Sequence, residues 1–124
     1  MNKKILVIED DNRISGVMRT IFQLNKIEAD FAATGEDGLS LLADGTDYKM
    51  ILSDIMLPGI DGYAILKEVK ANEKTKKIPF VFLSAFADDA DIHKGIQHGA
   101  DDYITKPFAA KTLVDIVRVY LESE

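Results

Sequence analysis

The stretch Ile5-Leu6-Val7-Ile8-Glu9-Asp10-Asp11 decides the fold, because four apolar residues run without a break into three carboxylates. A continuous apolar run of this length, bounded by polar residues, is typical of a strand covered on both faces of a parallel sheet. Similar runs occupy residues 50–53 and 80–83, and a shorter one occupies residues 103–105. Residues 29–33 are predicted as a fifth strand from their position between two helical patterns.

Apolar residues between these runs recur at the helical spacing of three and four positions. Asp11 or Asn12 is placed to cap the first helix, and Pro58-Gly59 suits a type II turn before the third. The apolar positions of the five helical segments are Ile14, Val17, Met18, Ile21 and Phe22; Leu39 and Leu42; Tyr63, Leu66 and Val69; Ile92 and Ile96; and Leu113, Val114, Ile116, Val117, Tyr120 and Leu121. Five β-α units joined by right-handed crossovers predict an α/β fold, a five-stranded parallel sheet with helices on both faces. No linker or repeat interrupts the pattern, so we expect one domain over residues 1–124.

The charge balance argues against several functions. The chain of 124 residues has 15 basic and 21 acidic residues and a net charge of −6, whereas direct binding to nucleic acid or to an anionic membrane needs a basic surface. The absence of cysteine excludes disulfides and thiolate metal sites. The basic start Met1-Asn2-Lys3-Lys4 is followed by only four apolar residues, too few for a signal peptide or a membrane span. We therefore expect a cytoplasmic protein.

Polar side chains follow the predicted strands at the edge where open α/β sheets bind their ligands, beyond the carboxyl ends. In chain order they are Glu9-Asp10-Asp11, Asp54, Ser84 and Lys106. Carboxylates that meet at one edge raise one another's pKa unless positive charge neutralises them, and Lys106 and a bound cation both offer that charge. Ligand atoms that are all oxygen indicate Mg²⁺, with Mn²⁺ as an alternative.

Each of these residues also has a simpler interpretation. The acidic run 9–11 is then a solvated helix cap, Asp54 a loop residue, and Ser84 a cap of the next helix. Lys106 merely leads into the last helix, because the proline that follows it favours a first helical turn. Any one motif alone is more often structural, but their joint position at successive strand ends favours a site.

The residues at these strand ends resemble a known family. The segments that carry the resemblance are 5–11; Ser53-Asp54-Ile55-Met56-Leu57-Pro58-Gly59-Ile60-Asp61-Gly62; Ser84-Ala85; and 99–108, which reads Gly-Ala-Asp-Asp-Tyr-Ile-Thr-Lys-Pro-Phe. In this order and spacing they are similar to the receiver domains of bacterial two-component response regulators, with the size and layout of the single-domain chemotaxis regulators. The resemblance covers essentially the whole chain and implies a (βα)5 flavodoxin-like fold.

The resemblance implies a phosphoryl acceptor and a metal site. Asp54 matches the acceptor aspartate. Asp10 matches a direct metal ligand, and Glu9 matches a ligand that acts through water. The backbone carbonyl of Met56 completes the protein ligands, whereas Asp11 lies one position past the acidic pair and is interpreted as a helix cap.

The resemblance also implies a phosphoryl-binding pair and a switch. Ser84 matches the hydroxyl that bonds a phosphoryl oxygen, and Lys106 matches the lysine that pairs with it, joined to Pro107 by a bond that is usually cis. Movement of Ser84 toward the phosphoryl group then opens space into which the Tyr103 ring turns. This motion is expected to reshape the surface formed by the fourth helix, fifth strand and fifth helix.

The implied function is that of a phosphorelay switch rather than a turnover enzyme. A sensor histidine kinase or a phosphotransfer protein would donate the phosphoryl group, and a downstream effector protein or domain would read the output. The protein is expected to be a monomer or a weak homodimer. No direct contact with nucleic acid or membrane is expected.

Three alternatives remain to be compared with this interpretation. A nucleotide-binding protein would need a glycine-rich turn where the chain has Glu9-Asp10-Asp11. A phosphatase of the haloacid-dehalogenase type carries an Asp-x-Asp motif after its first strand, whereas the candidate nucleophile here follows the third. An interaction module of the same fold that works without phosphorylation usually lacks an acidic residue or the lysine, and this chain keeps them.

Overall fold

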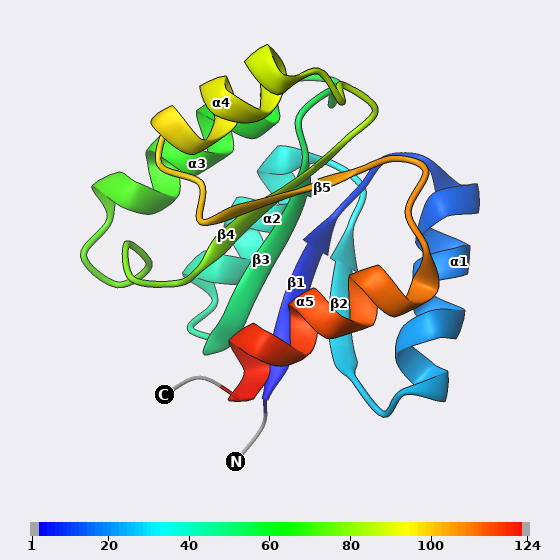
Figure 1. Ribbon diagram of the computed structural model, residues 1–124. Coiled ribbons are helices and arrows are strands. Elements are labelled where there is room, and N and C mark those ends of the chain that lie inside the picture. Colours follow the sequence, from blue (N-terminus) through cyan, green and yellow to red (C-terminus); the bar gives the residue numbers. More distant parts are fainter. Residues whose placement is uncertain (1–2, 123–124) are drawn as a thin grey trace.

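The computed structural model describes residues 3–122, in which strands and helices alternate throughout (Figure 1). The strands are β1 (Lys4–Ile8), β2 (Glu28–Ala32), β3 (Tyr48–Asp54), β4 (Phe80–Ser84) and β5 (Asp102–Thr105). The helices are α1 (Asn12–Leu24), α2 (Gly35–Ala43), α3 (Gly62–Ala71), α4 (Asp89–Gln97) and α5 (Ala110–Glu122). The strands pair in parallel in the order β2-β1-β3-β4-β5, which confirms the predicted fold class. Residues 1–2 and 123–124, included in the expected domain, lie outside the described residues.

The strands differ from their predicted ranges at the ends. β3 begins at Tyr48, two residues before the apolar run, because the buried phenol donates a hydrogen bond of 2.6 Å to Asp30 on β2. β4 continues to Ser84, which pairs in register with Thr105, and β2 is shifted one residue toward the N-terminus. Sheet pairing runs through the backbone, so it continues past the residues that an apolar pattern identifies.

The sheet separates two buried clusters, because successive side chains of a strand point to opposite faces. Ile5 and Val7 of β1 pack in the cluster under α1 and α5, whereas Leu6 and Ile8 pack in the cluster under α2 and α3. Figure 1 shows the helices arranged accordingly around the sheet. Coverage of both faces explains why the central strands are continuously apolar.

Capping residues start the helices at the carboxyl edge of the sheet. Asp11, rather than Asn12, caps α1 by accepting a hydrogen bond of 2.9 Å from the backbone N–H of Arg13. Asp61 caps α3 in the same way, and Gly59 before it has the positive φ of 75° that a type II turn requires. These caps fix the loops that carry the polar residues of the strand ends. Within residues 3–122, every helix is too short or too polar to cross a membrane.

Candidate functional site

Three carboxylates converge where β1 and β3 end. These strands are neighbours, and Ile8 pairs in register with Ser53, so the residues that follow, Glu9 and Asp54, lie side by side. Oxygen atoms of Glu9, Asp10 and Asp54 all lie within 4.8 Å of one another. Glu9 and Asp54 are buried, with 2% and 6% of their surfaces exposed, whereas Asp10 is exposed to solvent. The parallel register thus assembles the predicted acidic cluster.

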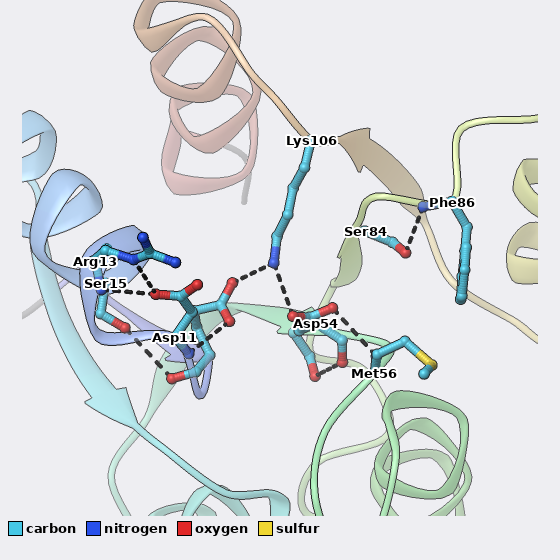
Figure 2. Close-up of polar contacts among 10 residues, drawn as sticks. Asp11, Arg13, Ser15, Asp54, Met56, Ser84, Phe86 and Lys106 are labelled. Carbon is cyan, nitrogen blue, oxygen red and sulfur yellow. Dashed lines mark hydrogen bonds and ion pairs between the residues drawn. The ribbon is translucent and has the colours of Figure 1, made fainter.

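Lys106 directly follows β5, two strands away from β3, and brings a positive charge to this cluster. Its ammonium lies 2.6 Å from Glu9 Oε1 and 2.8 Å from Asp54 Oδ2, and Figure 2 shows the side chain extended toward Asp54. The backbone N–H of Lys106 donates to the carbonyl of Ser84, which anchors the residue beside β4. The bond from Lys106 to Pro107 is cis, as the resemblance implied. Pro107 precedes α5 by several residues, so the interpretation of Lys106 as a mere approach to a first helical turn is wrong.

Burial and pairing set the charge states at this site. Burial raises the pKa of Glu9, the nearby charge of Asp54 raises it further, and hydrogen bonds from Lys106 and from the N–H of Asp11 oppose both effects. Burial alone would lower the pKa of Lys106, but its hydrogen bonds to Asp54 and Glu9 outweigh burial and raise that pKa. Lys106 therefore stays protonated, and its ammonium pairs with two of the three carboxylates, those of Glu9 and Asp54.

Ser84 lies at the end of β4 and is almost fully buried. The hydroxyl oxygen accepts a hydrogen bond of 3.1 Å from the N–H of Phe86, as Figure 2 shows. Ser84 does not cap α4, because the residue at that position is Asp88, so the simpler interpretation of this serine is wrong. Asp54 pairs with Leu83 in the sheet, which places Ser84 one residue beyond the acceptor strand's end.

The Tyr103 ring is buried in this structure. Only 9% of the residue is exposed, and its hydroxyl donates a hydrogen bond of 2.7 Å to the carbonyl of Phe86. The ring packs edge-on near Phe82, with centroids 6.2 Å apart. The ring thus has the inward position that the expected switch assigns to it, and its dependence on movement of Ser84 stays a prediction.

The family model described as the response regulator receiver domain matches residues 5–118, a span that includes every site residue described above. The chain belongs to this family. The receiver domain is 36% identical over 117 residues to the transcriptional regulatory protein AfsQ1 of Streptomyces coelicolor, and 38% identical over 124 residues to the nisin biosynthesis regulatory protein NisR of Lactococcus lactis. These alignments cover 94% and 98% of this chain but 50% and 51% of the two proteins, so the chain spans about half the length of these curated relatives.

Solved receiver structures are similar in fold. The receiver domain of Francisella response regulator 1452 has a TM-score of 0.86 and 31% identity, with 98% of each chain covered. The receiver domain of sensor histidine kinase PA1611 from Pseudomonas aeruginosa has a TM-score of 0.88 and 28% identity, with 99% of this chain and all of that chain covered. In that structure a magnesium ion is coordinated in the active-site cleft.

Gly62 is a site residue of this receiver domain that the sequence analysis quoted without giving it a role. A β-carbon there would lie 2.5 Å from the backbone oxygen of Asp54 and 2.7 Å from Cα of Ile55. The N–H of Gly62 also donates to the carbonyl of Ile55 at 2.8 Å. Glycine therefore lets the start of α3 pack directly against the backbone that carries Asp54, and only the three-dimensional contact reveals this requirement.

The donor set of this receiver domain suits a hard cation. Three carboxylates and one ammonium leave an excess of negative charge, and the ligand atoms in the cluster are all oxygen. Mg²⁺ prefers such oxygen ligands and retains several waters, which fits a site with one exposed carboxylate. The exposed side of Asp10 leaves the cluster open to solvent and to a second molecule.

Proposed function

We infer that this receiver domain accepts a phosphoryl group on Asp54 in a Mg²⁺-dependent reaction. The observation that carries the proposal is the environment of that carboxylate, which is nearly buried, lies 2.8 Å from the Lys106 ammonium and shares a cluster with Glu9 and Asp10. An ionised carboxylate is itself a nucleophile, so it needs no general base. Phosphoryl transfer depends mainly on positioning and charge neutralisation, and this site supplies both.

Asp10, Asp54 and the backbone carbonyl of Met56 would hold the cation, with Glu9 acting through water. A bound Mg²⁺ or Mn²⁺ would offset negative charge on the incoming phosphoryl oxygens. The N–H of Met56 already donates to Asp54 Oδ1 at 3.3 Å, which orients the carboxylate. The magnesium ion in the PA1611 receiver structure supports the choice of metal.

The chain's own side chains complete the reaction. An oxygen of Asp54 attacks the phosphorus while the bond from phosphorus to the donor's leaving group breaks. The Lys106 ammonium then has a phosphoryl oxygen to pair with in place of one carboxylate oxygen, and the Ser84 hydroxyl donates to another. Each contact needs a short side-chain movement from the geometry described above.

The proposed partners follow from the switch chemistry. A phosphohistidine on a sensor histidine kinase or a phosphotransfer protein would be the donor, and a downstream effector protein or domain would read the result. The added charge beside Ser84 would alter the β4–α4 loop that Tyr103 contacts, and through it the surface of α4, β5 and α5. The domain would act in the cytoplasm as a monomer or weak homodimer, and as a switch rather than a turnover enzyme.

The test is incubation with acetyl phosphate, with Mg²⁺ in one sample and EDTA in the other. We expect intact mass spectrometry to show one added phosphoryl group with Mg²⁺ and little or none with EDTA. Amide chemical shifts of the phosphorylated sample should change around Asp54 and on the surface of α4, β5 and α5. A protein that stays unmodified in both samples would support a phosphorylation-independent interaction module, and shifts confined to Asp54 would contradict the proposed output surface.

A further inference from the structure

Gly95, in the middle of α4, faces the aromatic residues of the switch region. It is buried, and a β-carbon built on it would lie 3.0 Å from Cδ2 and 3.1 Å from Cε2 of the Tyr103 ring. The same β-carbon would lie 3.1 Å from Cδ2 of Phe82. These distances are shorter than ordinary van der Waals contacts between carbon atoms, so with a side chain here a ring would have to give way by a few tenths of an ångström.

The backbone at Gly95 does not explain the choice of glycine. The residue is helical and lacks the positive φ found at Gly45, Gly59 and Gly99. Glycine in a helix interior is less favourable than alanine, because it loses more conformational freedom on folding. Gly16 in α1 is also helical, but a β-carbon there would meet no atom within 4 Å. Of these two helical glycines, only Gly95 borders aromatic rings, and it borders the Tyr103 ring.

Of the two rings, only that of Tyr103 is partly exposed and can rotate toward the surface. Phe82 is fully buried and is enclosed by Tyr63 and Phe80, whose ring centroids lie 5.1 Å and 5.3 Å away. Tyr103 reaches the surface, and hydrogen bonds with the carbonyl of Phe86 and with the side chain of Ser84 hold its hydroxyl inside. Crowding at position 95 would therefore displace Tyr103 rather than Phe82.

We propose that Gly95 is a positioning residue of the switch, which gives the Tyr103 ring the space that its buried position requires. By leaving room for the ring, Gly95 keeps the Phe86 carbonyl bonded to Tyr103 and the β4–α4 loop tied to β5. An alanine at this position would shift the protein toward an outward ring. The consequence for signalling rests on the proposed function, whereas the position of the ring does not.

The test compares Gly95→Ala with the matched control Gly16→Ala by NMR of the unphosphorylated protein. In Gly95→Ala we expect loss of the nuclear Overhauser contacts between the rings of Tyr103 and Phe82, and faster relaxation of Tyr103 ring protons by a soluble paramagnetic agent. Gly16→Ala should leave both unchanged. A strong contact between the methyl group introduced by Gly95→Ala and an inward Tyr103 ring would overturn the proposal.

A thermal measurement gives an independent readout. Gly16→Ala should raise the melting temperature, because alanine favours the helix, whereas Gly95→Ala should not raise it. In a Tyr103→Ala background, where the crowded ring is gone, Gly95→Ala should raise the melting temperature as Gly16→Ala does. An equal rise for Gly95→Ala with and without Tyr103 would show that the ring and Gly95 are not coupled.

The same variant separates this inference from the proposed function. Gly95 lies outside the acidic cluster, so Gly95→Ala should still gain one phosphoryl group from acetyl phosphate and Mg²⁺. Failure of both wild type and variant to gain it would contradict phosphoryl acceptance and leave the ring measurement to decide the role of Gly95. An inward ring in a variant that is phosphorylated normally would contradict the role of Gly95 alone.

Discussion

Replacing Asp54 with Asn is expected to abolish phosphorylation by acetyl phosphate. The amide keeps the size of the side chain but removes the anionic oxygen that attacks phosphorus, and it removes one of the three carboxylates of the cluster. Intact mass spectrometry should therefore show a full loss of the phosphoryl adduct under conditions that modify wild type. An undiminished adduct on Asp54→Asn would mean that another residue is the acceptor.

Asp11→Asn is the matched control for this substitution. Asp11 lies two residues from Glu9, but its side chain caps α1, and asparagine is an equally good cap. The control removes one negative charge near the site without touching the acceptor, so its adduct should form as in wild type. A loss in both variants would point to a general effect of charge on the acidic loop.

Replacing Lys106 with Met is expected to destabilise the metal-free protein strongly. The ammonium is the partner of Glu9 and Asp54, whose side chains are nearly inaccessible to solvent, with 0% and 8% exposed. Removing one partner of a buried ion pair costs about 3–5 kcal/mol, because the remaining charge stays buried without compensation. Urea unfolding in EDTA should show this loss, whereas Lys111→Met, which breaks the exposed pair with Asp115 on α5, should change the unfolding free energy little.

The loss in Lys106→Met should depend on pH in a defined direction. The pKa of Glu9 is raised in the folded wild-type protein, so its contribution to stability is present below the unfolded pKa and is lost as the pH rises through the folded pKa. Lys106 lowers the pKa of Glu9, so its removal raises that pKa further. The pH range over which the folded protein loses stability then extends to higher pH. The variant should therefore lose more stability at about pH 8 than at about pH 5.5. A loss independent of pH would contradict an ionised, buried Glu9.

The parallel sheet and the convergence of polar residues at one edge were predictable from the sequence for physical reasons. Continuous apolar runs reveal strands covered on both faces, and right-handed crossovers then bring the carboxyl ends together. Glu9, Asp54 and Lys106 could therefore be placed near one another before any coordinates were known. The strand ends at Tyr48 and Ser84 were missed because backbone pairing and a side-chain hydrogen bond, rather than apolar pattern, determine them.

The close contacts around the site were not predictable in the same way. Gly62 lies against the Asp54 backbone, and Gly95 lies against the Tyr103 ring. A glycine in the sequence does not indicate which atoms occupy the space beside it, so these contacts could not be predicted. The inward position of Tyr103 also depends on contacts with α4 and the β4–α4 loop, which form only when α4 packs against β5. Packing density at such positions is a property of the assembled fold.

The central claim is that a divalent cation binds in the cluster of Glu9, Asp10 and Asp54, and Mn²⁺ titration of the isotopically labelled protein tests it most directly. Paramagnetic broadening should begin at amides beside Asp10, Asp54 and Met56, should saturate at one site, and should be reversed by excess Mg²⁺. Broadening that starts instead at other exposed acids, such as Asp88 and Asp89 at the start of α4, or that Mg²⁺ fails to reverse, would contradict it.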